Sequence, residues 1–204
     1  MGQSVKEELQ KQLFDKYPKI FGDHTKSPQE TCMCWGLDVG DGWYDIIDVL
    51  CQAITNTYST SLKIDEVDAK HLGVEPYKFK DEVSYIYSIN CPQVVAQQVK
   101  EKFGELRFYW QFEFNNDIKY LLETKKYPKL DIIIDNFRNF IDGIVHFAEV
   151  LADSTCEETG QRGEMHTTGG WYKVLNREIA TNDDYKKNNY KPVTDYKKEK
   201  EFNL

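Results

Sequence analysis

The sequence predicts an α+β fold in which three or four helices pack on a small, mainly antiparallel sheet, with a long helix at the centre. Two periodic segments carry this prediction. Residues 105–114 alternate apolar and polar side chains, which is typical of a strand with one buried face. Residues 132–153 repeat apolar side chains at spacings of three and four, which is typical of an amphipathic helix. With 204 residues, 40% of them hydrophobic, the chain can bury one core.

The first half of the chain contains two predicted helices and one strand. Residues 4–16 place an apolar stripe on an otherwise charged helix. Asp41 is a predicted N-cap for a second helix, which is expected to end near Thr57. The buried face of this second helix is expected to consist of Tyr44, Ile47, Leu50, Cys51 and Ile54. Residues 83–89 have the β-branched and aromatic composition of a strand.

Three elements are expected between residues 92 and 126. Pro92 suits the first turn of a helix over 92–103, and Gly104 suits its end. A short helix is expected over 116–126. In the strand 105–114 the alternation assigns one set of side chains to the core, namely Leu106, Phe108, Trp110, Phe112 and Phe114.

The C-terminal part of the chain divides into a hairpin and a polar tail. Four glycines punctuate the segment 160–175 and predict a small hairpin. Residues 1–180 are expected to form one compact domain, with insertions near 59–90 and 115–130. Residues 181–204 contain almost no aliphatic side chains, so we expect a C-terminal tail that is partly disordered or drapes over the surface.

Charge and hydropathy exclude some classes of partner. The formal net charge is −8, and a nucleic-acid backbone is bound by clustered cations, so we expect no direct contact with nucleic acid. No apolar run approaches the length that spans a bilayer, and the first ten residues lack the apolar core of a signal peptide. The sequence therefore predicts a cytoplasmic protein without membrane contact.

The five cysteines do not predict a disulfide framework, because the count is odd and no signal peptide precedes them. Cys32, Cys34, Cys156 and His166 are the residues from which a zinc site would have to be built, but their spacing does not match paired zinc ligands. We therefore predict unligated thiols, no bound metal and no cofactor.

Three stretches together resemble a family of small, uncharacterised proteins from phage and prophage genomes. They are VGDGWYDIIDVLC (39–51), VVAQQVKEKFGELRFYW (94–110) and TCEETGQRGEMHTTGGWYKVL (155–175). In many relatives the third stretch resembles a knuckle that begins with a CxxC-like pair, whereas here Glu157, Glu158 and Thr159 follow Cys156. The resemblance implies a viral protein that acts in the cytoplasm of the host cell. It implies no reaction.

Two glycine-containing turns and one strand face supply the candidate ligand-binding residues. Glycines let a ligand approach the backbone, aromatic rings stack on a base or ribose, and cations bind phosphate. The candidates are Trp43, Tyr44, Arg107, Tyr109, Arg162, His166, Trp171, Tyr172 and Lys173. A structural alternative stays open for each candidate: Asp41 as a cap with Trp43 in the core, a structural hairpin with Trp171 buried against the long helix, and Arg107 and Tyr109 on a solvated sheet face.

No complete catalytic motif is present, because HExxH, GxSxG and the phosphate-binding loop are all missing. We therefore expect a non-enzymatic phage protein that sequesters a small nucleotide-like anion, a nucleotide-derived signal of host immunity. An inhibitor that binds a host defence protein through its acidic and aromatic surface is the alternative. A metal-dependent hydrolase is the second alternative, and it would use Asp38, Asp41, Asp45 and Asp48. Self-association into a homo-oligomer stays open.

Overall fold

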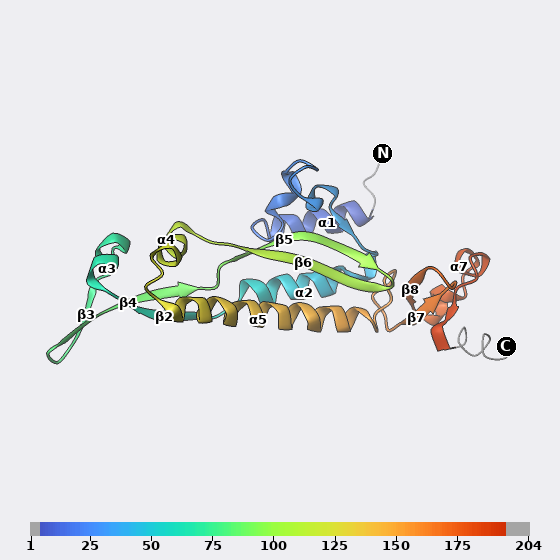
Figure 1. The fold of residues 1–204 in the computed structure, drawn as a ribbon. Coiled ribbons are helices and arrows are strands. Elements are labelled where there is room, and N and C mark those ends of the chain that lie inside the picture. Colours follow the sequence, from blue (N-terminus) through green and yellow to red (C-terminus); the bar gives the residue numbers. More distant parts are fainter. Residues whose placement is uncertain (1–4, 195–204) are drawn as a thin grey trace.

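The computed structural model describes residues 5–194 and shows an elongated α+β molecule with one long helix (Figure 1). That helix is α5 (Pro128–Ala152), and the predicted fold class is thereby confirmed. The other α-helices in the described residues are α1 (Val5–Lys16), α2 (Tyr44–Thr55), α3 (Glu66–Leu72), α4 (Asn116–Thr124), α6 (Arg177–Ala180) and α7 (Asp183–Lys187). Three short 3-10 helices are η1 (Gly22–Thr25), η2 (Cys32–Trp35) and η3 (Asp41–Trp43).

The strands of the described chain form three separate three-stranded sheets. In the central sheet β5 pairs in parallel with β1 and antiparallel with β6; the bounds are β1 (Leu37–Asp38), β5 (Gln93–Lys102) and β6 (Glu105–Glu113). An antiparallel sheet near the start of α5 has the order β2 (Ser59–Ile64), β4 (Glu82–Asn90), β3 (Pro76–Phe79). Another beyond the end of α5 has the order β8 (Tyr172–Leu175), β7 (Glu164–Thr167), β9 (Lys191–Pro192).

The helix α5 contributes to two hydrophobic cores at once. Its second half packs with α1, α2, β5 and β6 through Ile141, Val145, Ala148 and Ala152. Its first half packs with β2, β4 and α4 through Leu130, Ile134 and Phe137. The apolar repeat that predicted the helix is therefore one continuous stripe that serves both cores, which explains a length of 25 residues in one helix.

The helix expected over residues 92–103 is wrong, because this segment is the strand β5. Three valines within it favour a pleated strand, and nine residues of β6 pair with it in antiparallel register. The residues between the two strands, Phe103 and Gly104, have φ angles of 57° and 79°. Positive φ at both central positions is the requirement of a type I′ two-residue hairpin turn, so Gly104 follows a strand and not a helix.

The strand expected over residues 105–114 is confirmed, and so is its alternation. Leu106 and Phe108 are buried, whereas Tyr109 and Gln111 are exposed. Trp110 and Phe112 are half-buried, and the guanidinium of Arg138 on α5 lies over both rings, 5.6 and 5.2 Å from their centroids. The strand over 83–89, the helix over 116–126 and the C-terminal hairpin are confirmed as β4, α4 and β7–β8.

The predicted N-cap role of Asp41 is wrong, because a turn of 3-10 helix precedes α2 and no side chain caps either helix. Instead, the turn of residues 40–43, here called the glycine turn, packs on the backbone of residues 155–160, here called the glutamate turn. The Gly42 N–H donates to the Glu157 carbonyl oxygen at 2.8 Å. The Trp43 Nε1–H donates to the Thr155 carbonyl oxygen, also at 2.8 Å.

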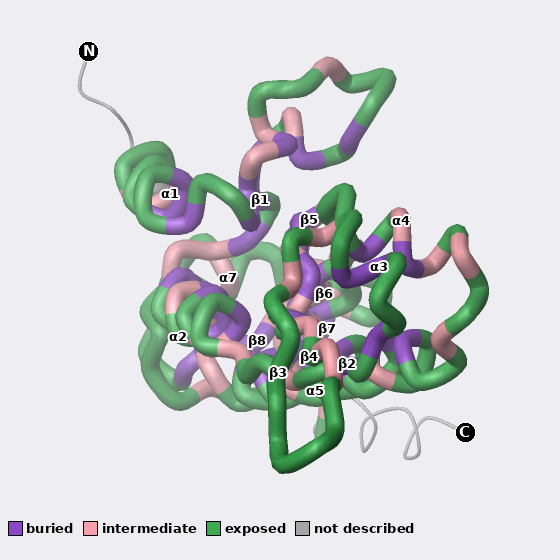
Figure 2. Tube along the Cα trace, turned by 90° about the vertical axis from the view of Figure 1, so that its left-hand side faces the viewer, coloured by how far each residue is buried: buried purple, intermediate pink, exposed green. Residues whose placement is uncertain are grey.

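The described part of the polar tail lies on the C-terminal sheet. β9 pairs with His166 and Thr167 of β7, and the Tyr185 hydroxyl donates to Glu158 at 2.6 Å. Of the two expected states, residues 181–194 therefore show the draped one, while residues 195–204 of the predicted tail lie outside the described residues. None of the helices in residues 5–194 is long and apolar enough to cross a bilayer. At the opposite end of the molecule, β3 is exposed along its length (Figure 2).

Replacing Gly42 by alanine should destabilise the protein by about 3 kcal/mol, at the upper end of the range for overpacking. A Cβ at this position would lie 2.2 Å from both the Cys156 carbonyl oxygen and the Gly160 amide nitrogen, so backbone has to move. Chemical denaturation measures the loss. Gly143→Ala on α5 is the matched control, since its Cβ meets nothing within 4 Å, and it should stabilise by about 1 kcal/mol. Equal effects of the two changes would contradict the close packing of the turns.

Candidate functional site

The two aromatic residues of the glycine turn lie in the core. Trp43 is 0% exposed and Tyr44 is 4% exposed, so neither ring has a free face for a ligand. Burial raises the pKa of Tyr44 to about 12, with the nearby Asp41 carboxylate adding to the shift. This placement corrects the expectation that the two rings stack on a base. It agrees with the structural alternative for Trp43, because a buried indole usually needs a hydrogen-bond acceptor and Thr155 supplies one.

The predicted residues of β6, Arg107 and Tyr109, interact with side chains of the neighbouring strand and of α5. Arg107 is held by Glu105 and also lies 3.9 Å from a carboxylate oxygen of Glu149 on α5. Tyr109 is on the solvent face, where the ammonium of Lys100 lies 5.9 Å from its ring centroid. Both side chains therefore behave as part of a solvated sheet face with local charge pairs.

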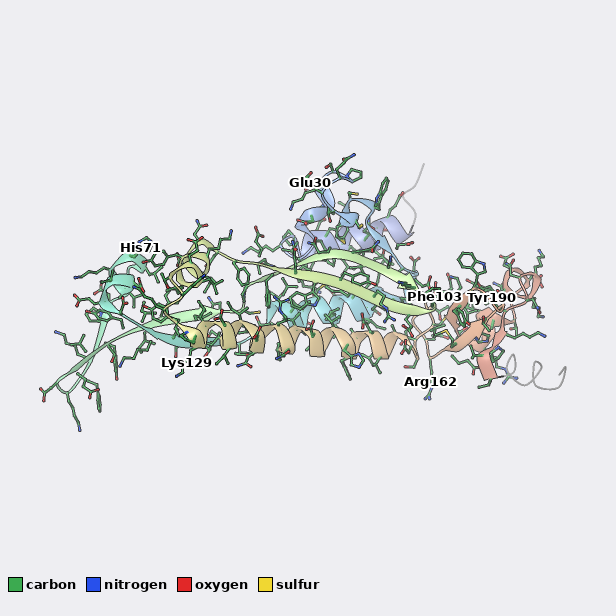
Figure 3. The ribbon with its side chains drawn as sticks, viewed as in Figure 1. Glu30, His71, Phe103, Lys129, Arg162 and Tyr190 are labelled. Atoms are coloured by element: carbon green, nitrogen blue, oxygen red, sulfur yellow. The ribbon has the colours of Figure 1, made fainter. Side chains whose placement is uncertain are left out.

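Arg162 and His166 also do not converge on a common ligand position. Arg162 is exposed, and Figure 3 shows its side chain pointing away from the body of the molecule. His166 is buried, and its Nδ1 lies 2.8 Å from the Glu164 carbonyl oxygen. Successive side chains of β8 point to opposite faces of the sheet, so Tyr172 points away from its neighbour Lys173. The Cβ of Tyr172 lies next to Gly104 at the tip of the β5–β6 hairpin.

Trp171 and Lys173 do share a site, a cavity of about 730 Å³ between the C-terminal sheet and α7. Trp171 is 76% exposed, so its ring is available to a ligand. The remaining lining comes from the glutamate turn, from Thr168 and from residues 179–190: Glu158, Ile179, Asn182, Asp184, Tyr185, Asn188 and Tyr190. We call this site the C-terminal pocket.

The sequence analysis did not predict that residues of the C-terminal tail line this pocket. Tyr185 and Tyr190 stack edge to face with their centroids 5.5 Å apart, and both line the cavity. A local signal for α7, the helix that carries Tyr185, was present, because Asn182 precedes two aspartates. Its side chain accepts a hydrogen bond from the Asp184 N–H at 2.8 Å, which is the N-cap arrangement. The polar composition of the tail concealed that signal.

Lys173 is the one cation that lines the pocket among the described residues, and two glutamates hold it. Its Nζ lies 2.6 Å from an oxygen of Glu157 and 3.2 Å from an oxygen of Glu158. Burial alone would lower the pKa of Lys173, but the hydrogen bond and charge of Glu157 outweigh burial and raise it. The ammonium therefore stays protonated, and its charge is already compensated.

Glu157 is a buried carboxylate with one oxygen unused. Its side chain is 5% exposed, and burial raises its pKa although the bond to Lys173 works in the opposite direction. Its Oε2 has no hydrogen-bond partner among the described residues. Burial and the hydrogen bond to Glu158 likewise raise the pKa of Tyr185, so its hydroxyl remains a donor.

Within residues 5–194 no three histidine, cysteine, aspartate or glutamate side chains gather as a group that could hold a metal ion. Of the four aspartates considered for a metal, Asp48 is engaged by Lys16 at 2.7 Å and by the hydroxyl of Tyr17 at 2.9 Å. Cys156 is fully buried, whereas Cys32 is exposed. The arrangement that the structure does form is a pocket of rings, amides and compensated charge.

Lys173→Met should destabilise the protein by about 3 kcal/mol near neutral pH, because it leaves the carboxylate of Glu157 buried without a cation. Without Lys173 the folded-state pKa of Glu157 rises further above its unfolded value. The loss of stability relative to the wild type should therefore be largest above that raised pKa. It should shrink as the pH falls towards about 4, where Glu157 is mostly protonated in the folded state of both proteins.

Denaturation of the wild type and of Lys173→Met across this pH range measures the effect, and the difference between them cancels the titration of other groups. The double variant Glu157→Gln/Lys173→Met is the control and should recover part of the stability. A deficit that is the same at every pH would show that the buried charge is not its cause.

Comparison of the chain with family models, with curated proteins and with solved structures finds no match.

Proposed function

We propose that this chain is a non-enzymatic binding protein whose C-terminal pocket holds a small ligand with a flat ring. The observation that carries the proposal is a ring-lined cavity of about 730 Å³ in which an exposed tryptophan lies beside a charge-paired lysine. A cavity of this size matches the usual range for small-molecule sites. The paired tyrosines and Trp171 supply ring faces, and Asn182 and Asn188 supply polar edges.

The charges in and around the pocket favour a cationic or neutral ligand over an anion. Glu158 and Asp184 line the cavity, Glu157 lies behind Lys173, and the single ammonium is already bound by two carboxylates. A phosphate would have to displace Glu157 from Lys173 and leave that carboxylate buried and unpaired, which is costly. A ring that carries positive charge would instead gain from the carboxylates and from stacking on Trp171.

This proposal keeps the general form of the sequence hypothesis and changes the chemistry of the ligand. Sequestration without catalysis, by a phage protein acting against a host defence, remains the biological setting that we propose. The nucleotide-derived signal expected from the sequence is replaced by a ligand in which the ring, and not the phosphate, dominates recognition. The pocket residues Trp171 and Lys173 support this change, because the first is open and the second is occupied.

Calorimetric titration with two matched probes tests the proposal. Nicotinamide riboside carries a flat cationic ring, and nicotinamide mononucleotide is the same molecule with one added phosphate. We expect the riboside to bind at least about tenfold more tightly, a difference of about 1.4 kcal/mol. Trp171→Ala should weaken the riboside by about tenfold through lost stacking, and Asp184→Asn should weaken it by less.

Trp35→Ala is the matched control, because Trp35 is 77% exposed but does not line the C-terminal pocket. It should leave the affinity unchanged. Tighter binding of the mononucleotide would restore the anionic ligand of the sequence hypothesis. Equal affinities in the wild type and in Trp171→Ala would remove the pocket as the binding site.

A further inference from the structure

The solvent side of α5 carries an apolar stripe of exposed side chains, one of which, Phe140, packs edge to face on Tyr58 with the ring centroids 5.6 Å apart. Its members are Ile132, Phe140, Phe147, Val150 and Leu151. Phe147 is 64% exposed and Ile132 is 59% exposed. Ile132, Phe140 and Phe147 are spaced by eight and seven residues, and the last two members follow Phe147 at three and four, so all five lie on one side of the helix. Exposed apolar side chains gathered on one face of a helix are a candidate interaction surface.

The stripe consists of other residues than those buried in the cores, and the partly buried Ile133 and Ile144 connect the two sets along one flank. Ile134, Phe137 and Ile141 are buried towards the cores, so α5 carries both buried and exposed apolar side chains. From Ile132 to Leu151 the exposed stripe extends over about 28 Å at the helical rise of 1.5 Å per residue. A partner helix of about 20 residues has the same length.

Near the middle of the stripe stands Gly143. It is exposed, and a Cβ at this position would meet nothing within 4 Å. In an interior helical position glycine costs about 1 kcal/mol relative to alanine, and the packing of this chain does not require it. Absence of a side chain there leaves room for another helix to approach between Phe140 and Phe147.

One flank of the stripe is acidic. Asp131, Asp135 and Asp142 are exposed and recur at spacings of four and seven, and none of them has an ion-pair partner among the described residues. The arginine on the same flank, Arg138, stacks over Trp110 and Phe112 and so is directed towards β6. Between the carboxylates and the stripe stand only the polar Asn139 and His146.

We propose that this face of α5 docks an amphipathic helix of a partner protein whose apolar stripe is bordered by lysine or arginine. Apolar contact along the stripe would supply the burial, and the unpaired aspartates would select a basic flank. A second copy of this chain is a poorer occupant. Two copies packed antiparallel about a twofold axis bring the same flanks together, so the carboxylates would face one another.

Two synthetic helices of about 20 residues test this inference. They share one leucine stripe and differ only in their flanking positions, which are lysine in one peptide and glutamate in the other. Binding to the full chain is measured by fluorescence anisotropy at physiological ionic strength. We expect the lysine peptide to bind at least about tenfold more tightly than the glutamate peptide, and we expect its advantage to fall with added salt.

Two variants make the result specific to α5. Phe147→Ser should weaken the lysine peptide by about tenfold or more, through loss of a large apolar contact. Asp135→Lys/Asp142→Lys changes only exposed positions and should reverse the preference between the peptides. Val67→Ser on α3 is the matched control, because Val67 is 69% exposed elsewhere, and it should change nothing. Thermal unfolding checks that each variant is folded.

Equal binding of both peptides, or a preference that survives the double charge reversal, would overturn the proposal. So would sedimentation of the free protein as a dimer that Phe147→Ser dissociates, because a second copy would then be the occupant. Trp171→Ala should leave peptide binding intact, which separates this surface from the C-terminal pocket.

Discussion

The contact between the glycine turn and the glutamate turn fixes the relation between the start of α2 and the end of α5. It consists of two hydrogen bonds from Gly42 and Trp43 and of backbone packed so closely that no Cβ fits at Gly42. Because the turn of residues 155–160 carries both glutamates that hold Lys173, the same contact positions the charges of the C-terminal pocket. Two segments more than 100 residues apart thus set one site.

The electrostatics of that pocket follow from burial. A lysine beside an exposed tryptophan would be a natural anion site if its charge were free. Here the ammonium is paired with Glu157, and removing it would leave a buried carboxylate without a cation, which is costly. Glu158 adds a second carboxylate. The consequence is a site in which aromatic surface and carboxylates dominate. Ligand recognition there depends on shape and stacking more than on phosphate binding.

The helix α5 organises the rest of the molecule in a different way. One side supplies apolar residues to both cores, while the other leaves large apolar side chains in solvent next to unpaired aspartates. Packing in the two cores explains the apolar residues on the first side. It does not explain the exposed apolar residues on the second side. The helix α5 therefore connects the cores with an external surface. Because the glutamate turn follows its end, α5 is also connected to the C-terminal pocket.

The sequence by itself determined the elements in which local pattern and environment agree. The alternation in β6 and the apolar repeat of α5 reflect one-sided burial, so both were predictable, as were β4, α4 and the C-terminal hairpin. Tertiary structure decided the rest. Residues 93–102 became a strand because β6 pairs with them, Trp43 became a core residue because a distant turn accepts its N–H, and the tail completed the pocket. Each of these outcomes depends on partners remote in the chain, and local spacing contains no information about such partners.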